Sequence, residues 1–132
     1  MVTGLYAGIL ALMYVGLSIY VIRFRLKYQV SIGDGGHEPL HKAMRAHGNF
    51  AEFVPLPLIL MLILEMNSFN PFEEAPLYLH GLGILLVMGR LVHVFGVLGE
   101  NPILLARQFG MMATFLTLII AAALLITQLV TA

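Results

Sequence analysis

The sequence predicts an all-α integral membrane protein, a single domain over residues 1–132 that crosses the bilayer with four helices in up-down order. Composition is the first reason, because 60% of the residues are hydrophobic, only 11% are charged, and the mean hydropathy is +0.93. A soluble domain of this length would leave much of that apolar surface in water. The second reason is that the apolar residues gather in four runs, each near the roughly 20 residues that a helix needs to cross the hydrocarbon core.

The four runs define the expected spans, which are residues 3–22, 46–66, 75–97 and 104–130. Polar connections separate the runs, and the Gly, Asn and Pro residues in them are helix breakers. Pro55 and Pro57 stand inside the second span, where a membrane helix tolerates proline if its neighbours satisfy the freed carbonyls. We therefore expect a kink at this point and a wider gap between the helices.

The positive charges predict the orientation of the spans. All seven Lys and Arg residues fall in or beside the first connection, or near the ends of spans three and four on the same side. Lys and Arg accumulate on the cytoplasmic side of a membrane. Both chain ends are therefore expected on the non-cytoplasmic side, and any site among these cations is expected to face the cytoplasm.

Two absences limit the chemistry. The sequence has no cysteine, which excludes a thiol nucleophile or thiolate metal site of its own, so thiol chemistry would need a co-substrate. His37, His41 and His47 follow no spacing typical of metal ligands, and no metal is expected. The formal net charge is zero, which gives no sign of a nucleic-acid partner.

Polar side chains inside the spans require an explanation, because ionisable groups are costly in lipid and tend to face the interior of a bundle. The second span carries Arg45, Asn49 and Glu52 at positions i, i+4 and i+7, which lie on one helical face. The third span carries Arg90 and His93 at positions i and i+3, again on one face. The predicted topology brings both groups to the cytoplasmic end of the bundle.

Two interpretations of these residues remain open. In the structural one, Glu52 forms an ion pair with Arg90, His93 packs in the core, and Arg45 and Arg107 extend to the lipid headgroups. In the functional one, the cations converge with one carboxylate and one amide to bind a small polar anion. The arginine fork matches a carboxylate, and a positive site lowers the pKa of a thiol so that the thiolate forms.

A resemblance to a known family rests on the string RAHGNFAEFVP at residues 45–55 and on RLVH at residues 90–93. Both strings are similar to signatures of the MAPEG superfamily (membrane-associated proteins in eicosanoid and glutathione metabolism), and residues 30–36 resemble its bacterial, microsomal-glutathione-transferase-like branch. The resemblance extends over essentially the whole chain. It implies a homotrimer whose active sites lie between neighbouring subunits and open to the cytoplasm.

The resemblance also implies roles for individual residues. Glutathione, as a co-substrate, would be held by Arg23, Lys42, Arg45, Asn49, Glu52, Arg90 and His93. Among these, Glu52 would take the amino group and Arg45 a carboxylate. Arg107 matches the arginine that stabilises the glutathione thiolate, and it is the expected catalytic residue.

Two positions depart from the family pattern. Val97 stands where the family's enzymes often have a tyrosine, four residues after the third-helix histidine. Gln108 stands where members similar to prostaglandin E synthase have a serine beside the thiol-activating arginine. Thiolate stabilisation would therefore rest on Arg107 and backbone dipoles, and eicosanoid synthesis is not expected.

The resemblance thus implies a membrane glutathione transferase with a second activity as a peroxidase, which would serve detoxification in a bacterial inner membrane. The thiolate would attack a hydrophobic electrophile or a lipid hydroperoxide that enters from the bilayer. Two other classes remain open: a non-catalytic lipid-binding scaffold and a small proton-coupled multidrug exporter. The exporter would depend on Glu52, which lies near one end of its span, whereas such sites usually lie near the midplane.

Overall fold

The computed structural model describes residues 1–67 and 76–131, and over these ranges it contains helices and connections but no strand. The helices are α1 Val2–Tyr28, α2 Glu38–Phe53, α3 Pro55–Asn67, α4 Leu77–Leu98 and α5 Leu104–Thr131. Because α2 and α3 follow one another in a single span, the described residues form four candidate membrane crossings. The predicted all-α, four-span fold is confirmed.

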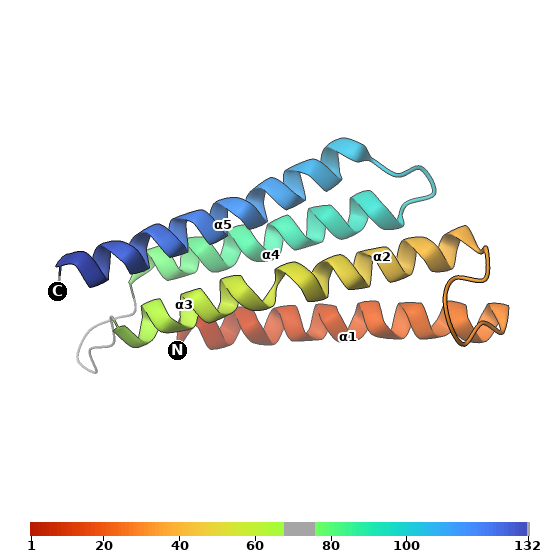
Figure 1. The fold of residues 1–132 in the computed structure, drawn as a ribbon, viewed down its shortest axis with the longest axis horizontal. Coiled ribbons are helices and arrows are strands. Elements are labelled where there is room, and N and C mark those ends of the chain that lie inside the picture. The colour runs from red at the N-terminus through yellow and green to blue at the C-terminus, as the bar shows by residue number, and fades with distance from the viewer. Residues whose placement is uncertain (68–75, 132) are drawn as a thin grey trace.

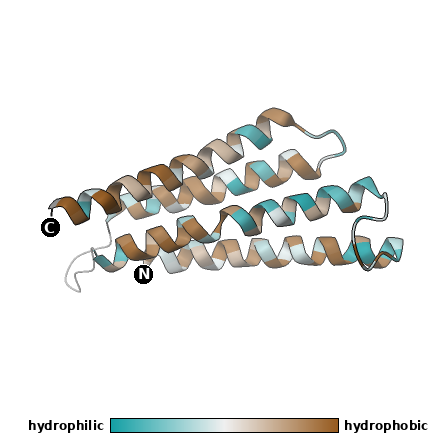
Figure 2. Ribbon diagram, in the orientation of Figure 1, coloured by the Kyte–Doolittle hydropathy of each residue, from teal (hydrophilic) through white to brown (hydrophobic). Residues whose placement is uncertain are grey.

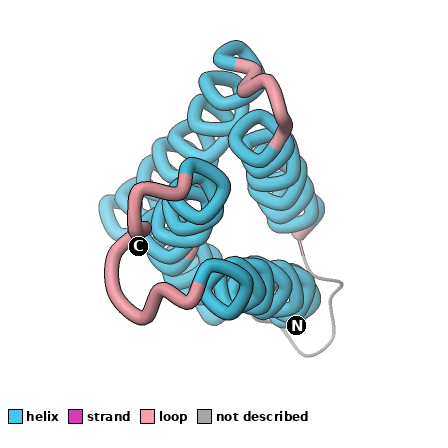
Figure 3. Tube along the Cα trace, turned by 90° about the vertical axis from the view of Figure 1, so that its right-hand side faces the viewer, coloured by secondary structure: helices cyan, strands magenta, loops and turns pink. Residues whose placement is uncertain are grey.

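The spans alternate in direction, so both chain ends lie at one end of the bundle (Figure 1). We call this the terminal end, and we call the opposite end, with connections 29–37 and 99–103, the basic end. Figure 3 views the molecule from the basic end and shows the helices side by side with these connections toward the reader. α4 packs against each of the other helices, and most extensively against α5.

The outer surface of the bundle is apolar. Leu12, Ile59, Phe95 and Ile119, from four different helices, are each at least half exposed. Figure 2 shows the same pattern as apolar colouring along α3 and the second half of α5, with polar residues gathered on α2 and the connections at the basic end. Such a surface would associate or aggregate in water, whereas lipid is its natural solvent.

The predicted kink in the second span is confirmed. α2 ends at Phe53 and α3 begins at Pro55, because proline has no N–H to donate and its ring crowds the preceding turn. The backbone bond from Val54 N–H to the Phe50 carbonyl is kept at 3.0 Å, and the next, from Leu58 N–H to the Val54 carbonyl, lengthens to 3.4 Å. The two helices therefore bend rather than separate.

At the basic end, α1 and α2 extend beyond the spans expected from hydropathy. α1 continues to Tyr28 instead of ending at residue 22, with Lys27 in its last turn. α2 begins at Glu38 instead of at residue 46, with that carboxylate in its first turn. Both charges have the sign that stabilises the corresponding helix end. Hydropathy detects only the lipid-facing turns, whereas the helices also continue through polar sequence.

The connection between α1 and α2 is held by side chains at its base. Arg25 donates from Nη1 to three carbonyl oxygens at 3.0–3.3 Å, those of Val30, Ser31 and Gly33. Asp34 accepts from the Gly36 N–H at 3.0 Å and lies 2.8 Å from Nδ1 of His41. The Gly36 N–H and the neighbouring His41 hold the pKa of the exposed Asp34 carboxyl below its usual value. Polar groups therefore give this connection a defined shape.

At the terminal end, Glu65 of α3 caps the first turn of α1. Its carboxylate accepts hydrogen bonds from the backbone N–H groups of Val2 and Thr3, at 2.5 and 2.9 Å. The Glu65 side chain is buried. The first N–H groups of a helix have no partner within the helix, and a negative charge there also interacts favourably with the helix dipole. This contact joins α3 to the start of α1.

We expect Glu65→Gln to destabilise the folded protein by about 1–2 kcal/mol, because the neutral amide loses the charge at the helix terminus. The measurement is the midpoint of unfolding by sodium dodecyl sulfate, followed by circular dichroism. Glu52→Gln is the matched control, since Glu52 is exposed and makes no hydrogen bond or ion pair within the described residues. Equal shifts in the two variants would contradict a capping role for Glu65.

Candidate functional site

Arg90 is the most unusual side chain of the interior. It is fully buried, on the face of α4 that meets α5. Within the described residues its guanidinium makes a single hydrogen bond, from Nη2 to the Met111 sulfur at 3.6 Å, while Nε and Nη1 have no partner. A sulfur is a weak acceptor, so a buried cation is left with most of its donors unsatisfied.

His93 lies one turn from Arg90 on the same face of α4 and is also buried. Its backbone and Cβ lie directly against Gly110 of α5, where a methyl group would come within 2.6 Å of the His93 Cβ. Arg107, three residues before Gly110 on α5, lies against Gly96, three residues after His93 on α4. The structure thus brings three of the predicted site residues together along the contact between α4 and α5.

Arg107 lies at the basic end of the contact between α4 and α5. Its backbone N–H donates to the Ile103 carbonyl at 3.2 Å within the first turn of α5. A methyl group added to Gly96 of α4 would lie 2.8 Å from that same nitrogen, so the two helices nearly touch here. The Arg107 side chain is exposed and makes no hydrogen bond or ion pair to the rest of the described chain.

The second-helix residues lie on a face of α2 that its own chain covers only in part. Arg45 and Glu52 are exposed, and Asn49 between them is half-buried with an unpartnered Oδ1. The opposite face of α2 packs into the core through Ala46 and Phe50. Within the described residues no hydrogen bond or ion pair joins Arg45, Asn49 or Glu52 to α4 or α5, so the ion pair of Glu52 with Arg90 is not formed in this chain.

Two basic residues of the predicted site remain, Arg23 and Lys42, and their surroundings differ. Arg23 of α1 is exposed. Lys42 of α2 already has partners, because its ammonium lies 2.9 Å from Oε1 of Glu38 and 3.5 Å from the backbone carbonyl oxygen of Glu100. Lys42 therefore holds α2 against the connection between α4 and α5.

The three histidines near the first connection each have a different neighbour. His37 stacks on Tyr28, with ring centroids 4.0 Å apart, and His41 pairs with Asp34. Nε2 of His47 lies 3.1 Å from the Ser18 hydroxyl. Within residues 1–67 and 76–131, no three acidic, histidine or cysteine side chains gather as metal ligands would.

Sequence reasoning missed two contacts between helices. The Tyr6 hydroxyl of α1 lies 3.0 Å from Nδ1 of His80 on α4. On α1, Ser18 orients His47 of α2, and Tyr14 stacks on the same imidazole at 4.8 Å. Each pair joins residues far apart in the chain, and spacing along one helix carries no signal for such contacts.

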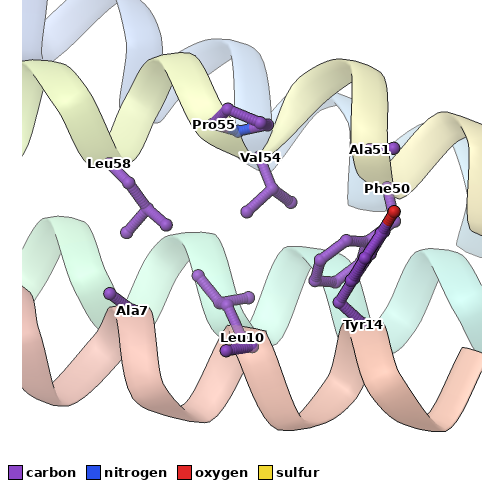
Figure 4. A pocket seen from close by; sticks show the side chains of 9 residues that line it. Ala7, Leu10, Tyr14, Phe50, Ala51, Val54, Pro55 and Leu58 are labelled. Carbon is purple, nitrogen blue, oxygen red and sulfur yellow. The ribbon is translucent and has the colours of Figure 1, made fainter.

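An apolar groove lies between α1 and the bend of the second span (Figure 4). It has a volume of about 330 Å³, at the lower end of the range of about 300–1,000 Å³ for small-molecule sites. Small residues leave the space open, namely Ala7 and Ala11 on α1 and Ala51 on α2, beside Pro55. The groove lies at the bend where a wider gap between helices was expected, and the Tyr14 ring lines one end of it.

Fold and site together define a class: an integral membrane bundle of four spans, with an unsatisfied arginine inside it and free charged side chains near its basic end. A match to the MAPEG family covers residues 3–127, and the chain belongs to this family. The chain is 38% identical over 120 residues to the inner membrane protein YecN of Escherichia coli (strain K12), covering 91% of this chain and 86% of that protein. YecN of Escherichia coli O6:H1 (strain CFT073) gives the same values. No solved structure matches the chain significantly.

Proposed function

We propose that this protein is a membrane glutathione transferase, with peroxidase activity toward lipid hydroperoxides as a second reaction. The observation that carries the proposal is the buried guanidinium of Arg90, with Nε and Nη1 unpartnered in the described chain. Leaving a buried charge unpaired costs several kcal/mol, roughly 3–5 where it has been measured by removing a partner. An anionic ligand would recover this energy, and glutathione carries two carboxylates.

The other groups complement the rest of the peptide. Arg45 would bind a carboxylate through its planar fork, and Glu52 would accept the amino group. Both are exposed and free within the described chain, as a binding group should be before its ligand arrives. The unpartnered Oδ1 of Asn49 would accept an N–H of the peptide. Arg23 and His93 would lie around the same ligand, whereas Lys42 is already paired and is the weakest member of the set.

The arrangement also supports a homotrimer with the site between subunits. Arg45 and Glu52 face outward from α2, and Arg107 is exposed at the start of α5. No bond connects these two groups of residues within the described chain, so a neighbouring copy would complete the site. Because Lys and Arg accumulate on the cytoplasmic side, the site would face the cytoplasm in a bacterial inner membrane.

Catalysis would be electrostatic and positional. Arg107 would stabilise the thiolate that forms when the glutathione S–H loses its proton, because a nearby cation lowers a thiol pKa. The sulfur would then form a bond to the electrophilic carbon of an apolar substrate, and the leaving group would depart with the electron pair. The apolar groove beside Pro55 would hold such a substrate where it arrives from the lipid. Proximity of the two reactants would supply much of the acceleration.

We expect the protein in lipid nanodiscs to show the ultraviolet difference band of glutathione thiolate near neutral pH, and Arg107→Ala to lose it. Lys27→Ala is the control, because it removes an exposed cation of α1 that is outside the proposed site. Glutathione binding without a thiolate band would favour the non-catalytic scaffold. If no glutathione binds, the proposed co-substrate is wrong.

A further inference from the structure

A second pocket lies at the basic end. Of the residues assigned to glutathione, Lys42 alone lines it. It has a volume of about 250 Å³ and is lined by Tyr20, Phe24, Lys27 and Tyr28 of α1, by Lys42 of α2, and by Glu100. It exists because α1 and α2 continue past their apolar turns, so that their polar ends and the connection between α4 and α5 enclose a space. We call it the basic-end pocket.

The charges of the basic-end pocket are only partly neutralised. Lys42 is paired with Glu38 at 2.9 Å. Lys27 and the Glu100 carboxylate, in contrast, form no ion pair with each other or with any other described residue. The residues that line the pocket thus include one with a free cation on α1 and one with a free anion on the opposite connection. A ligand that satisfies both must carry a negative and a positive group a short distance apart.

The aromatic lining favours an ammonium as the positive group. Tyr20 and Phe24 pack edge to face at 4.8 Å, and Phe24 stacks with Tyr28 at 5.9 Å. His37 stacks on Tyr28 at 4.0 Å and fixes the orientation of that ring. Ammonium groups bind over aromatic faces. Lys27 lies 5.3 Å from the centre of the Tyr28 ring, so Tyr28 already has a cation beside it, and the rings of Tyr20 and Phe24 are left for an ammonium of the ligand.

A phosphate fits best as the negative group of the ligand. Lys27 supplies a compact charge with three donors. The hydroxyls of Tyr20 and Tyr28 make no hydrogen bond within the described residues, so they are free to donate as well. A purely anionic ligand is disfavoured, because Glu100 would repel it and would remain unpaired.

We propose that the basic-end pocket binds the phosphoethanolamine headgroup of a membrane phospholipid. The phosphate contacts Lys27 and the tyrosine hydroxyls, and the ammonium lies between Glu100 and the rings of Tyr20 and Phe24. The lipid is favoured over a soluble headgroup because Ile103, on the connection that carries Glu100, and Leu104 at the start of α5 are more than half exposed. They provide apolar surface for the acyl chains on the side of the pocket that carries Glu100. The proposal does not depend on glutathione.

The test compares lipids that share acyl chains and differ in headgroup. Phosphatidylethanolamine or phosphatidylglycerol is titrated into the full chain in detergent without glutathione, and the thermal midpoint is followed by circular dichroism, since a ligand of the folded state raises it. We expect an apparent affinity about tenfold higher for phosphatidylethanolamine, the value of one charge-assisted contact. Equal affinities for the two lipids would overturn the proposal.

Two surface variants make the assignment specific. Glu100→Gln should abolish the preference between the lipids, and Lys27→Gln should weaken the binding of both. Asp34→Asn removes one negative charge at the same end outside the pocket, and it should keep the preference. A preference that survives in Glu100→Gln would exclude this pocket. Glycerophosphoethanolamine distinguishes the source: a midpoint shift with this soluble compound but none with the lipid would show that the ligand is not a membrane lipid.

Discussion

Replacing Arg90 by methionine should leave the ligand-free protein as stable as the wild type, or stabilise it by about 1–4 kcal/mol, and should weaken glutathione binding roughly hundredfold. Apolar residues of similar volume often replace buried ions without loss, because the desolvation of the charge is avoided. Met111 already provides an apolar, sulfur-containing neighbour for the new side chain. The binding loss follows from removing one partner of a buried charge pair, which costs about 2–5 kcal/mol.

Two measurements on one sample separate the interpretations of Arg90. Unfolding in sodium dodecyl sulfate gives the stability, and calorimetric titration in nanodiscs gives the affinity for glutathione. Met111→Leu is the control, because it removes the sulfur acceptor and keeps the shape of the core, so both quantities should stay near the wild-type values. A strong loss of stability in Arg90→Met with unchanged glutathione affinity would show that Arg90 is structural.

The four spans could be predicted because each is a long apolar run, and the bend at Pro55 could be predicted because proline lacks the N–H that a helix requires. Helix ends at the basic side were predicted too short, since the turns around Lys27 and Glu38 are polar although helical. Burial in lipid leaves a clear signal in composition. A helix that continues into water is held by caps and charges, which hydropathy does not measure.

For the site, helical spacing predicted which residues share a face but not which face turns inward. Glu52 and Arg90 both read as polar residues within a span, yet Glu52 is exposed and Arg90 is fully buried. The difference arises from the packing of α4 against α5, a contact between segments of separate spans. Glu65 shows the same limit, because its role depends on the position of the first turn of α1.

The same packing explains the prediction with the largest effect on folding, Gly110→Ala. The added methyl group would lie 2.6 Å from both the Gly89 carbonyl oxygen and the His93 Cβ, and 2.8 Å from the His93 backbone nitrogen. Two of these atoms belong to the backbone of α4, so the clash can be relieved only if the helices move apart. Overpacking typically costs about 1–3 kcal/mol, and separation would also weaken the neighbouring contact of Gly89 with Ala113.

Gly81→Ala on α4 is the matched control, because a methyl group there meets no atom of the described residues within 4 Å. It should be neutral or should stabilise the protein by about 0.5–1 kcal/mol, the usual gain from alanine within a helix. We expect Gly110→Ala to lower the yield of folded protein and its midpoint in sodium dodecyl sulfate, and to weaken glutathione binding, since Arg90 and His93 lie along the same contact. If both variants unfolded at the wild-type midpoint, the close approach of α4 and α5 at Gly110 would be wrong, and with it the burial that makes Arg90 a candidate for anion binding.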